Sequence, residues 1–290
     1  MMKKLCCLML AVALCLGLSG CSFTLGRMAA YDQAGRYSIG SFAYDAGAVD
    51  TVEINWRSGE IHLTEKAGPR LSVTEAAGKL SEAQQMHWLL DGGTLRIQFC
   101  ESGYRGPITG NKKLEMEIPA GIDLRVNCTS GDVFMGEHTL GALAVNITSG
   151  DVRLGNARAA SAAFNSTSGD VTTGLLDVAG ALAVNSTSGD TRIEALQAQS
   201  ARLNSTSGNI DLGLYQCGDT NISCTSGSVR LTVHPDHGAA VDYSTSSGSL
   251  NGRSVKNKAA HIEVGGGECR ARVSTTSGSL TVTEKEGDRR

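Results

Sequence analysis

Residues 146–154 read NITSGDVRL, residues 165–173 read NSTSGDVTT, and residues 185–193 read NSTSGDTRI. These stretches are copies of one unit, and their glycines follow one another after 19 or 20 residues. Further copies extend the series, with glycines at Gly131, Gly150, Gly169, Gly189, Gly208, Gly227, Gly248 and Gly278. A nearly fixed period of about 20 residues is typical of a stacked repeat architecture.

Each copy has the pattern of two short strands joined by a corner. Apolar and polar residues alternate on both sides of the glycine, as Val145, Val152 and Leu154 do around Gly150. An alternation with period two indicates β-strands that bury one face. The Ser-Gly pair between the strands suits a turn, because glycine accepts backbone angles that other residues avoid.

A single copy cannot fold alone. Burial of an aliphatic side chain gains about 2 kcal/mol, whereas ordering the backbone costs about 1–2 kcal/mol per residue. Stacking of coils supplies the missing stabilisation, because each coil adds a hydrogen-bond ladder and a continuous core to the next. We therefore predict an all-β fold, a single-stranded β-helix-like β-solenoid of 19- to 20-residue coils in which successive copies lie in register.

Two polar columns recur in the copies. Asparagines stand four residues before the glycine, at Asn127, Asn146, Asn165, Asn185 and Asn204. Aspartates stand one residue after it, at Asp132, Asp151, Asp170 and Asp190. Asparagines stacked in register can hydrogen bond amide to amide along the axis. We interpret both columns as a candidate surface ladder.

The Asp column has two other interpretations. Carboxylates about 4.8 Å apart can hold a hard cation such as Ca²⁺, but nearby arginines neutralise charge and Asp is also favoured in turns. Acid clusters on a β-helix also suggest a polysaccharide-acting enzyme. Equivalent positions have similar environments, however, whereas catalysis needs two groups with different pKa values. We expect no catalytic residue, no metal and no cofactor.

The segments around the repeats are less regular. Residues 49–120 contain a degenerate copy, Val52–Leu63, and further predicted strands. We interpret them as an N-terminal β cap that protects the first coil from edge-to-edge pairing. Residues 121–283 hold the solenoid repeats, and residues 284–290 form a charged tail. Residues 21–48 are expected to comprise a lipidated cysteine and a flexible tether.

Residues 1–20 predict a bacterial lipoprotein signal peptide. Lys3 and Lys4 precede the apolar stretch Leu5–Leu18, which is shorter than the roughly 20 residues that span a bilayer as a helix. The ending Leu18-Ser19-Gly20-Cys21 resembles a lipobox, which implies cleavage before Cys21 and lipidation of its thiol. Two or three acyl chains hold a protein durably on a membrane. We therefore expect an extracytoplasmic protein, lipid-anchored to a bacterial cell membrane; the alternative is a soluble secreted protein.

The net charge of the chain limits the kinds of partner that it can bind, and its cysteine count limits the disulfides that it can form. The signal peptide takes two of the 26 basic residues and leaves all 29 acidic ones. This negative balance argues against nucleic-acid binding, which needs a clustered positive surface. An odd number of cysteines follows Cys21, which excludes complete internal pairing. We expect small buried side chains or unpaired thiols at Cys100, Cys128, Cys217, Cys224 and Cys269.

Several segments resemble a known family. They are Ile54–Ile61, Asp91–Ile97, Lys113–Gly121 and the Thr-Ser-Gly-Asp-Val series. Together they cover about residues 49–283 and are similar to the putative adhesin family, bacterial envelope proteins with β-strand repeats and a domain of unknown function. The resemblance implies a repetitive β fold in the cell envelope and brings no catalytic or ligand residues with it.

We therefore expect a non-catalytic binding or adhesion module that presents a polar face. Its partners would be the membrane, through the lipid, and a cell-wall glycan, a host glycan or an envelope protein. The alternative is a structural or self-assembling envelope component in which coil ends or edges pair. A polysaccharide-acting β-helix enzyme is a further alternative.

Overall fold

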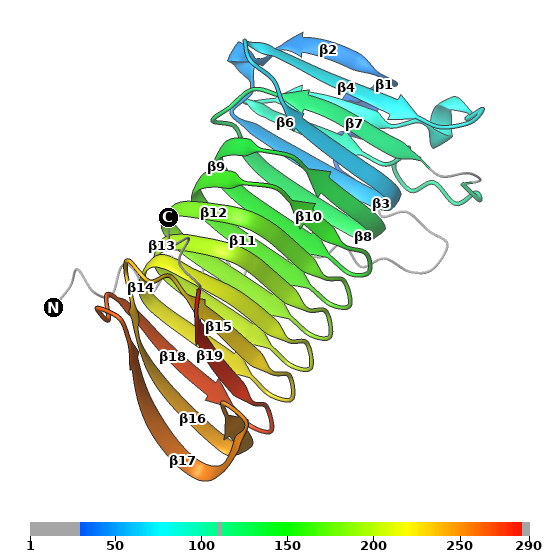
Figure 1. The fold of residues 1–290 in the computed structure, drawn as a ribbon. Helices are drawn as coiled ribbons and strands as arrows, with labels where there is room; N and C mark the ends of the chain where they lie inside the picture. The colour runs from blue at the N-terminus through cyan, green and yellow to red at the C-terminus, as the bar shows by residue number, and fades with distance from the viewer. Residues whose placement is uncertain (1–29, 109–111, 286–290) are drawn as a thin grey trace, which may run out of the picture.

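The computed structural model describes residues 30–108 and 112–285, without the side chains of residues 254–258. The expected signal peptide, Cys21 and most of the expected charged tail lie outside these residues. Figure 1 shows a stack of coils along one axis, with irregular strands at both ends. Within the described ranges, no helix is both long and apolar enough to cross a membrane.

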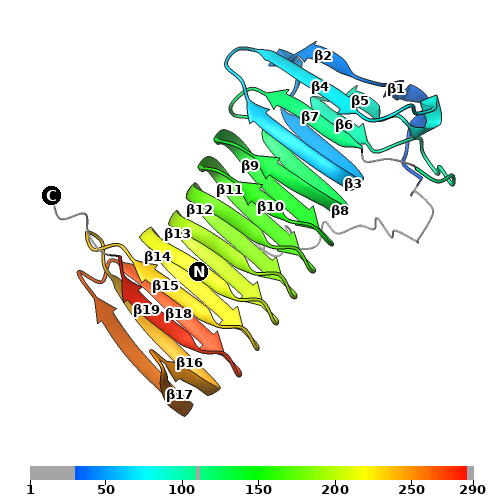
Figure 2. The same cartoon turned by 45° about the vertical axis from the view of Figure 1, so that its right-hand side comes forward.

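Eight strands form the regular centre of the stack. They are β8 (Asp123–Met135), β9 (His138–Ile147), β10 (Val152–Leu154), β11 (Ala157–Ser166), β12 (Val171–Ser186), β13 (Thr191–Ser205), β14 (Ile210–Cys224) and β15 (Val229–Val233). Neighbours pair in parallel, with Asn146 opposite Asn165 and Val152 opposite Val171. The predicted β-solenoid is therefore confirmed (Figures 1 and 2).

The corner glycines line up along the axis of the stack. A Cβ atom on Gly169 would overlap the carbonyl oxygen of Gly150, and Gly189 stands in the same relation to Gly169. Only a residue without a Cβ permits this close approach of backbones. The apolar residues beside the corner point inward, and Val145 and Phe164 are at most 1% exposed. Corner and core together fix the register of each coil on the next.

The C-terminal strands do not stack in chain order. They are β16 (Ala239–Leu250), β17 (Arg253–Val264), β18 (Cys269–Thr275) and β19 (Leu280–Glu284). β18 pairs in parallel with β14 on one side and with β16 on the other, while β17 folds back antiparallel on β16. The copy at Gly278 thus lies between those at Gly227 and Gly248. The expectation that successive copies stack on one another is wrong at this end, because the β16–β17 hairpin takes the outermost place.

The N-terminal strands are interleaved in a similar way. They are β1 (Ser38–Ile39), β2 (Phe42–Asp45), β3 (Thr51–Glu65), β4 (Arg70–Ala76), β5 (His87–Asp91), β6 (Thr94–Gln98) and β7 (Lys113–Ile118), with the 3₁₀ helices η1 (Ala34–Arg36), η2 (Ala46–Ala48) and η3 (Glu82–Gln84). β3 pairs in parallel with β8 on its inner side and with β6 and β7 on its outer side. β5 and β4 then pair antiparallel with β6 and β7. Antiparallel strands therefore cover the parallel ladder at this end.

Residues 38–45 are part of this end of the fold. β1 pairs with β5 and β2 pairs with β4. Phe42 of β2 stacks on Trp88, with ring centroids 3.9 Å apart. The flexible tether expected over residues 21–48 is therefore wrong for residues 38–45, because backbone pairing and aromatic packing hold them against the cap.

Candidate functional site

The five predicted asparagines form one continuous ladder along the stack. Each Nδ2 donates to the Oδ1 of the asparagine in the preceding coil, at 2.8–2.9 Å from Asn146 to Asn204. The side chains are half-buried. Asn55 extends the ladder by one coil, since it accepts from Asn127 at 2.8 Å. Sequence reasoning missed Asn55, although it stands four residues before Gly59 in the degenerate copy.

The predicted aspartates form a second row, with different bonding. Asp132, Asp151, Asp170 and Asp190 each accept, through Oδ1, the backbone N–H one residue after the corner glycine of the next coil, at 2.7–3.1 Å. Arg153 lies 2.7 Å from Asp151 and 3.9 Å from Asp132. In the described part of the chain, no cluster of three or more His, Cys, Asp or Glu side chains is arranged to hold a metal ion. The hydrogen bonds of this row therefore link the corner of each coil to the corner of the next.

The two rows stay separate. The asparagines precede the corner and the aspartates follow it, and no hydrogen bond joins one row to the other among the described residues. Two residues before the asparagine, the three middle coils of the ladder carry the short side chains of Ala144, Ala163 and Ala183, and the coils on either side of them carry Arg125 and Arg202. This part of the face is a flat polar stripe.

The face becomes hollow where the ladder ends. After Asn204 the same position holds Ser223, Ser274 and Ser244, in stacking order. The serines are exposed, and their shorter side chains leave an open groove of about 620 Å³. We call this the serine groove; its polar lining residues are Asn221, Ser223, Asp242, Ser244, His261, Arg272 and Ser274.

Four adjacent strands build the serine groove. β14, β18, β16 and β17 lie side by side at the C-terminal end of the stack (Figure 2). Their pairing aligns Asn221, Arg272, Asp242 and His261 across the strands. An amide, a guanidinium, a carboxylate and an imidazole therefore form one row, beside the row of hydroxyls. Only the interleaved order of the last coils produces this arrangement.

The imidazole in the groove is held by two carboxylates. His261 Nδ1 lies 2.7 Å from Asp242 Oδ1, and His261 Nε2 lies 3.3 Å from Glu263 Oε1. The hydrogen bond to Asp242, followed by that to Glu263, raises the pKa of His261 above its usual value. All three side chains are exposed. Arg272 makes no ion pair within the described part of the chain and is free to meet a ligand.

A second, smaller hollow lies near the N-terminal end. It measures about 430 Å³ and is lined by residues that include His62, Phe134 and Arg153. The ring centroids of His62 and Phe134 are 4.7 Å apart. The Arg153 guanidinium carbon lies 5.4 Å from the Phe134 ring centroid. These three side chains already pack on one another, so fewer polar groups are left for a ligand here.

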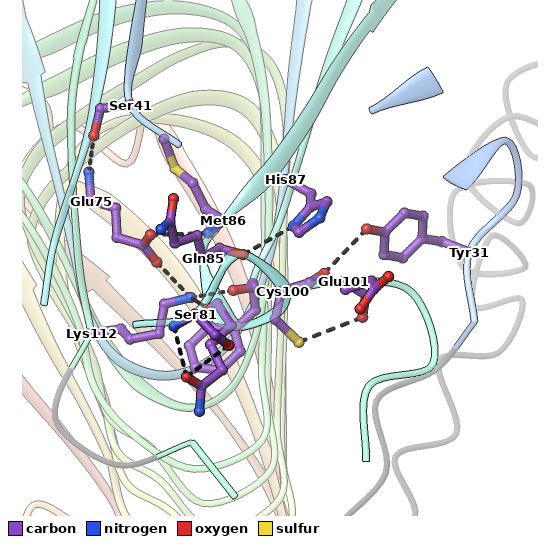
Figure 3. A network of polar contacts seen from close by, with 12 residues as sticks. Tyr31, Ser41, Glu75, Ser81, Gln85, Met86, His87, Cys100, Glu101 and Lys112 are labelled. Atoms are coloured by element: carbon purple, nitrogen blue, oxygen red, sulfur yellow. Dashed lines mark hydrogen bonds and ion pairs between the residues drawn. The ribbon is translucent and has the colours of Figure 1, made fainter. Parts of the chain in front are cut away.

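Sequence reasoning also missed a buried lysine in the cap. Lys112 lies 2.5 Å from Glu75 Oε1, and their side chains are 0% and 6% exposed. Its Nζ also donates to the carbonyl oxygens of Gln84 and Phe99, and Figure 3 shows Lys112 pointing toward Glu75. Burial lowers the pKa of Lys112, against the opposing effect of Glu75. No repeat position marks Lys112, so only the fold reveals it.

The Lys112–Glu75 pair belongs to the closure of the solenoid end. Glu75 Oε2 accepts from the backbone N–H of Met86 at 3.0 Å, and the Glu75 N–H donates to Ser41 at 3.0 Å. The lysine ammonium also lies 4.2 Å from the Phe99 ring centroid. Every partner of the pair comes from the cap or from the segment 38–45 that packs on it, and we assign the pair a structural role.

Comparison with known proteins finds one matching family model and similar solved structures. The family model Toastrack DUF4097 matches residues 49–283. A crystallised putative adhesin of Bacteroides fragilis is 14% identical with a TM-score of 0.46, over 84% of this chain and 97% of that one. A putative cell adhesion protein of Clostridium sporogenes is 9% identical with a TM-score of 0.23, over 86% and 100%. No curated protein is detectably similar in sequence.

Proposed function

This chain belongs to the Toastrack DUF4097 family, and from that premise we propose that it is a non-catalytic, glycan-binding module of the bacterial envelope. The serine groove is the proposed binding site. A lipid on Cys21 is the proposed anchor, which would hold the module outside the cytoplasm. The solenoid would then carry the groove at the end of the stack opposite the cap.

The polar lining of the serine groove is the observation that carries the proposal. Three hydroxyls, one amide, one carboxylate, one imidazole and the guanidinium of Arg272, which makes no ion pair with the described side chains, line a single open hollow. Ligand sites are usually concave and contain a few placed polar groups that fix orientation. Sugar hydroxyls both donate and accept hydrogen bonds, as serine and asparagine side chains do. The hollow extends across four adjacent strands, which suits a chain-like ligand.

The same geometry supports binding over polysaccharide cleavage. The groove lining contains one carboxylate, Asp242; it and the neighbouring Glu263 both contact His261 and are exposed to water. Acid catalysis of glycoside cleavage relies on two carboxyl groups held in different environments. Here one imidazole joins the two groups in a shared, solvated environment.

The ends of the stack give little support to the self-assembly alternative. Antiparallel strands cover both ends, β4 and β5 at one and β17 at the other. A second copy could pair with such an outer strand, but it could not continue the parallel coil-on-coil register across it.

The decisive experiment fills the groove without disturbing the fold. Ser223→Asn combined with Ser274→Asn extends the asparagine ladder from Asn204, and the added amides occupy the groove. We expect the chain without residues 1–21 to bind envelope or host glycans on an array, and this double variant to lose at least tenfold in affinity. Ser228→Asn adds the same atoms one residue after the corner Gly227 and serves as the matched control. Equal binding by all three proteins would refute the groove as the site.

The anchor is tested separately. Cys21→Ser should move the full-length protein from the membrane fraction to the soluble fraction. Mass spectrometry of the wild-type N-terminal peptide should show a diacylglyceryl group on Cys21. An unmodified peptide that begins upstream of Cys21 would contradict the anchor and leave the groove experiment unaffected.

A further inference from the structure

Two buried cysteines meet where the interleaved C-terminal coil joins the stack. The five cysteines in the described part of the chain have free thiols and are buried. Cys217 lies on β14, and Cys269 begins the neighbouring strand β18. Cys269 directly precedes Arg270, which pairs with Asp219. The register therefore brings Cys269 beside Cys217, with one extra residue on β14.

The contacts of the two residues show how close they are. The Cys217 N–H donates to Cys269 Sγ at 3.0 Å. Cys217 Sγ lies 3.1 Å from the Leu196 carbonyl oxygen, and Cys269 Sγ lies 4.0 Å from that of Tyr215. Neighbouring strands are about 4.8 Å apart, and a disulfide needs Cα atoms within about 7 Å. The spacing of β14 and β18 therefore suits a disulfide.

The other cysteines have separate roles. Cys128 Sγ donates to the Gly131 carbonyl oxygen at 3.4 Å, and Cys224 Sγ donates to that of Gly227 at 3.0 Å. Ser186 makes the same bond to Gly189 in a central coil, at 2.6 Å. Cys128 and Cys224 therefore act as corner donors in place of serine.

We infer that Cys217 and Cys269 form a disulfide that fastens the interleaved coil to the stack. The oxidant is a small-molecule or protein disulfide. The Cys269 thiolate attacks one sulfur of that carrier, giving a mixed disulfide and one carrier thiol. Cys217 then attacks the Cys269 sulfur and displaces the second carrier thiol. One S–S bond forms and one breaks, and the two cysteine protons leave on the two carrier thiols.

The local chemistry favours this order of steps. Hydrogen bonding from Cys217 lowers the pKa of the Cys269 thiol, whereas the pKa of the Cys217 thiol is raised by its hydrogen bond to Cys269 and by burial. The thiolate is the nucleophile in thiol–disulfide exchange. Both residues are at most 6% exposed in the folded chain, so the carrier has to reach Cys269 while β18 docks onto β14, once Cys217 is near enough to hydrogen bond to it.

The bond would secure the order of the last coils. It encloses residues 217–269, which include the whole β16–β17 hairpin. A cross-link across a long loop stabilises mainly by restricting the unfolded chain. It would also keep β18 between β14 and β16, an order that preserves the serine groove. The inference goes beyond glycan binding and stands without it, because it depends only on β14 and β18.

The test is a disulfide map of the full-length protein. The protein is refolded with oxidised glutathione, denatured, alkylated without reduction and digested. We expect a linked peptide pair that contains Cys217 and Cys269, while Cys100, Cys128 and Cys224 are alkylated. Reduction should lower the midpoint of thermal unfolding by on the order of 5–10 °C. Cys269→Ser should abolish both effects, whereas the matched control Cys224→Ser should keep both.

Two results would overturn the inference. One is quantitative alkylation of Cys217 and Cys269 after oxidation. The other is glutathione that remains attached to either residue, since this would show that the second exchange cannot occur. The wild-type peptide map decides the matter even if Cys269→Ser fails to fold.

Discussion

Asn165 shows what one ladder residue contributes to the stack. Its Nδ2 donates to Asn146 and its Oδ1 accepts from Asn185, both at 2.8 Å. The side chain is half-buried, so water replaces a lost partner only in part. A polar group left without a partner costs about 1–3 kcal/mol where it is buried. Each central asparagine therefore supports two neighbours as well as itself.

Asn165→Ala should lower the free energy of unfolding by about 1–3 kcal/mol, because it leaves one acceptor and one donor unpaired. Asn165→Asp should cost at least as much, since a carboxylate cannot donate to Asn146. Urea denaturation followed by circular dichroism measures both. Ser168→Ala at the exposed corner is the control and should change the unfolding free energy by less than about 0.5 kcal/mol. A similar loss in all three variants would contradict the ladder's contribution.

His261 makes the serine groove sensitive to pH. Its pKa is raised by Asp242 and then by Glu263, so the ion pairs are fully present below the ordinary histidine pKa of about 6.5. They are lost as pH rises through the raised value in the folded protein. An NMR titration should place the His261 midpoint above about 6.5. Asp242→Asn should lower it more than Glu263→Gln does, because the Asp242 contact is shorter, 2.7 Å against 3.3 Å. A wild-type midpoint at or below the ordinary value would contradict this.

At the scale of elements, the two ends of the solenoid are closed by different means. In the cap, Trp56 and Phe99 pack edge to face, with ring centroids 4.9 Å apart, under the Lys112–Glu75 pair. At the C-terminal end, the Tyr243 hydroxyl lies 3.0 Å from Thr275 Oγ1 and donates to the Gly278 carbonyl at 3.0 Å. The lysine ammonium and the tyrosine hydroxyl are therefore given partners, as burial requires, whereas the buried Trp56 Nε1 has no hydrogen-bond partner among the described residues.

Lys112→Met should lower the free energy of unfolding by about 3–5 kcal/mol, because it leaves the Glu75 carboxylate buried and unpaired. Lys112→Met combined with Glu75→Leu should recover much of this loss, since no buried charge then remains. Urea denaturation of both single variants and of the double variant completes a double-mutant cycle and gives the interaction free energy between the two residues. Losses that simply add in the double variant would show that the two residues do not act as a pair.

At the scale of the whole molecule, register is the property that every coil shares. The corner glycines, the Asn ladder and the core columns all repeat with the coil. Each coil contacts mainly its two neighbours, so stability is approximately a sum over coils and their interfaces. If one whole coil is removed, the two coils that flanked it can therefore still pair with each other in register.

Deletion of residues 151–169 should give a folded, shorter stack, because Gly150 is then followed by Asp170 and all columns realign. Circular dichroism should retain the β signal, and small-angle scattering should show a particle shorter by about 4.8 Å. Deletion of residues 151–160 is the matched control, and it should unfold the centre because it leaves only half a coil. Equal behaviour of the two deletions would contradict a register-based fold.

The serine groove and the thiol pair could not have been derived from the copies alone. Ser223, Ser244 and Ser274 are visible in the repeat column, but chain order places Ser244 beside Ser223. The fold places Ser274 between them. Cys217 and Cys269 are 52 residues apart and share no column of the repeat. Which strand pairs with the open edge of β14 depends on contacts between residues far apart in the sequence. No local sequence pattern predicts it.

The sequence by itself determined the β-solenoid, its coil length, its inward columns and its Asn ladder. These follow from a local repeat, because equal residues at equal spacing meet when coils stack. Only the tertiary structure decided the interleaved order of both ends, the burial of Lys112 against Glu75, and the meeting of Cys217 with Cys269. The ends have no further coil to copy, so their packing depends on which strand best covers the exposed edge and core.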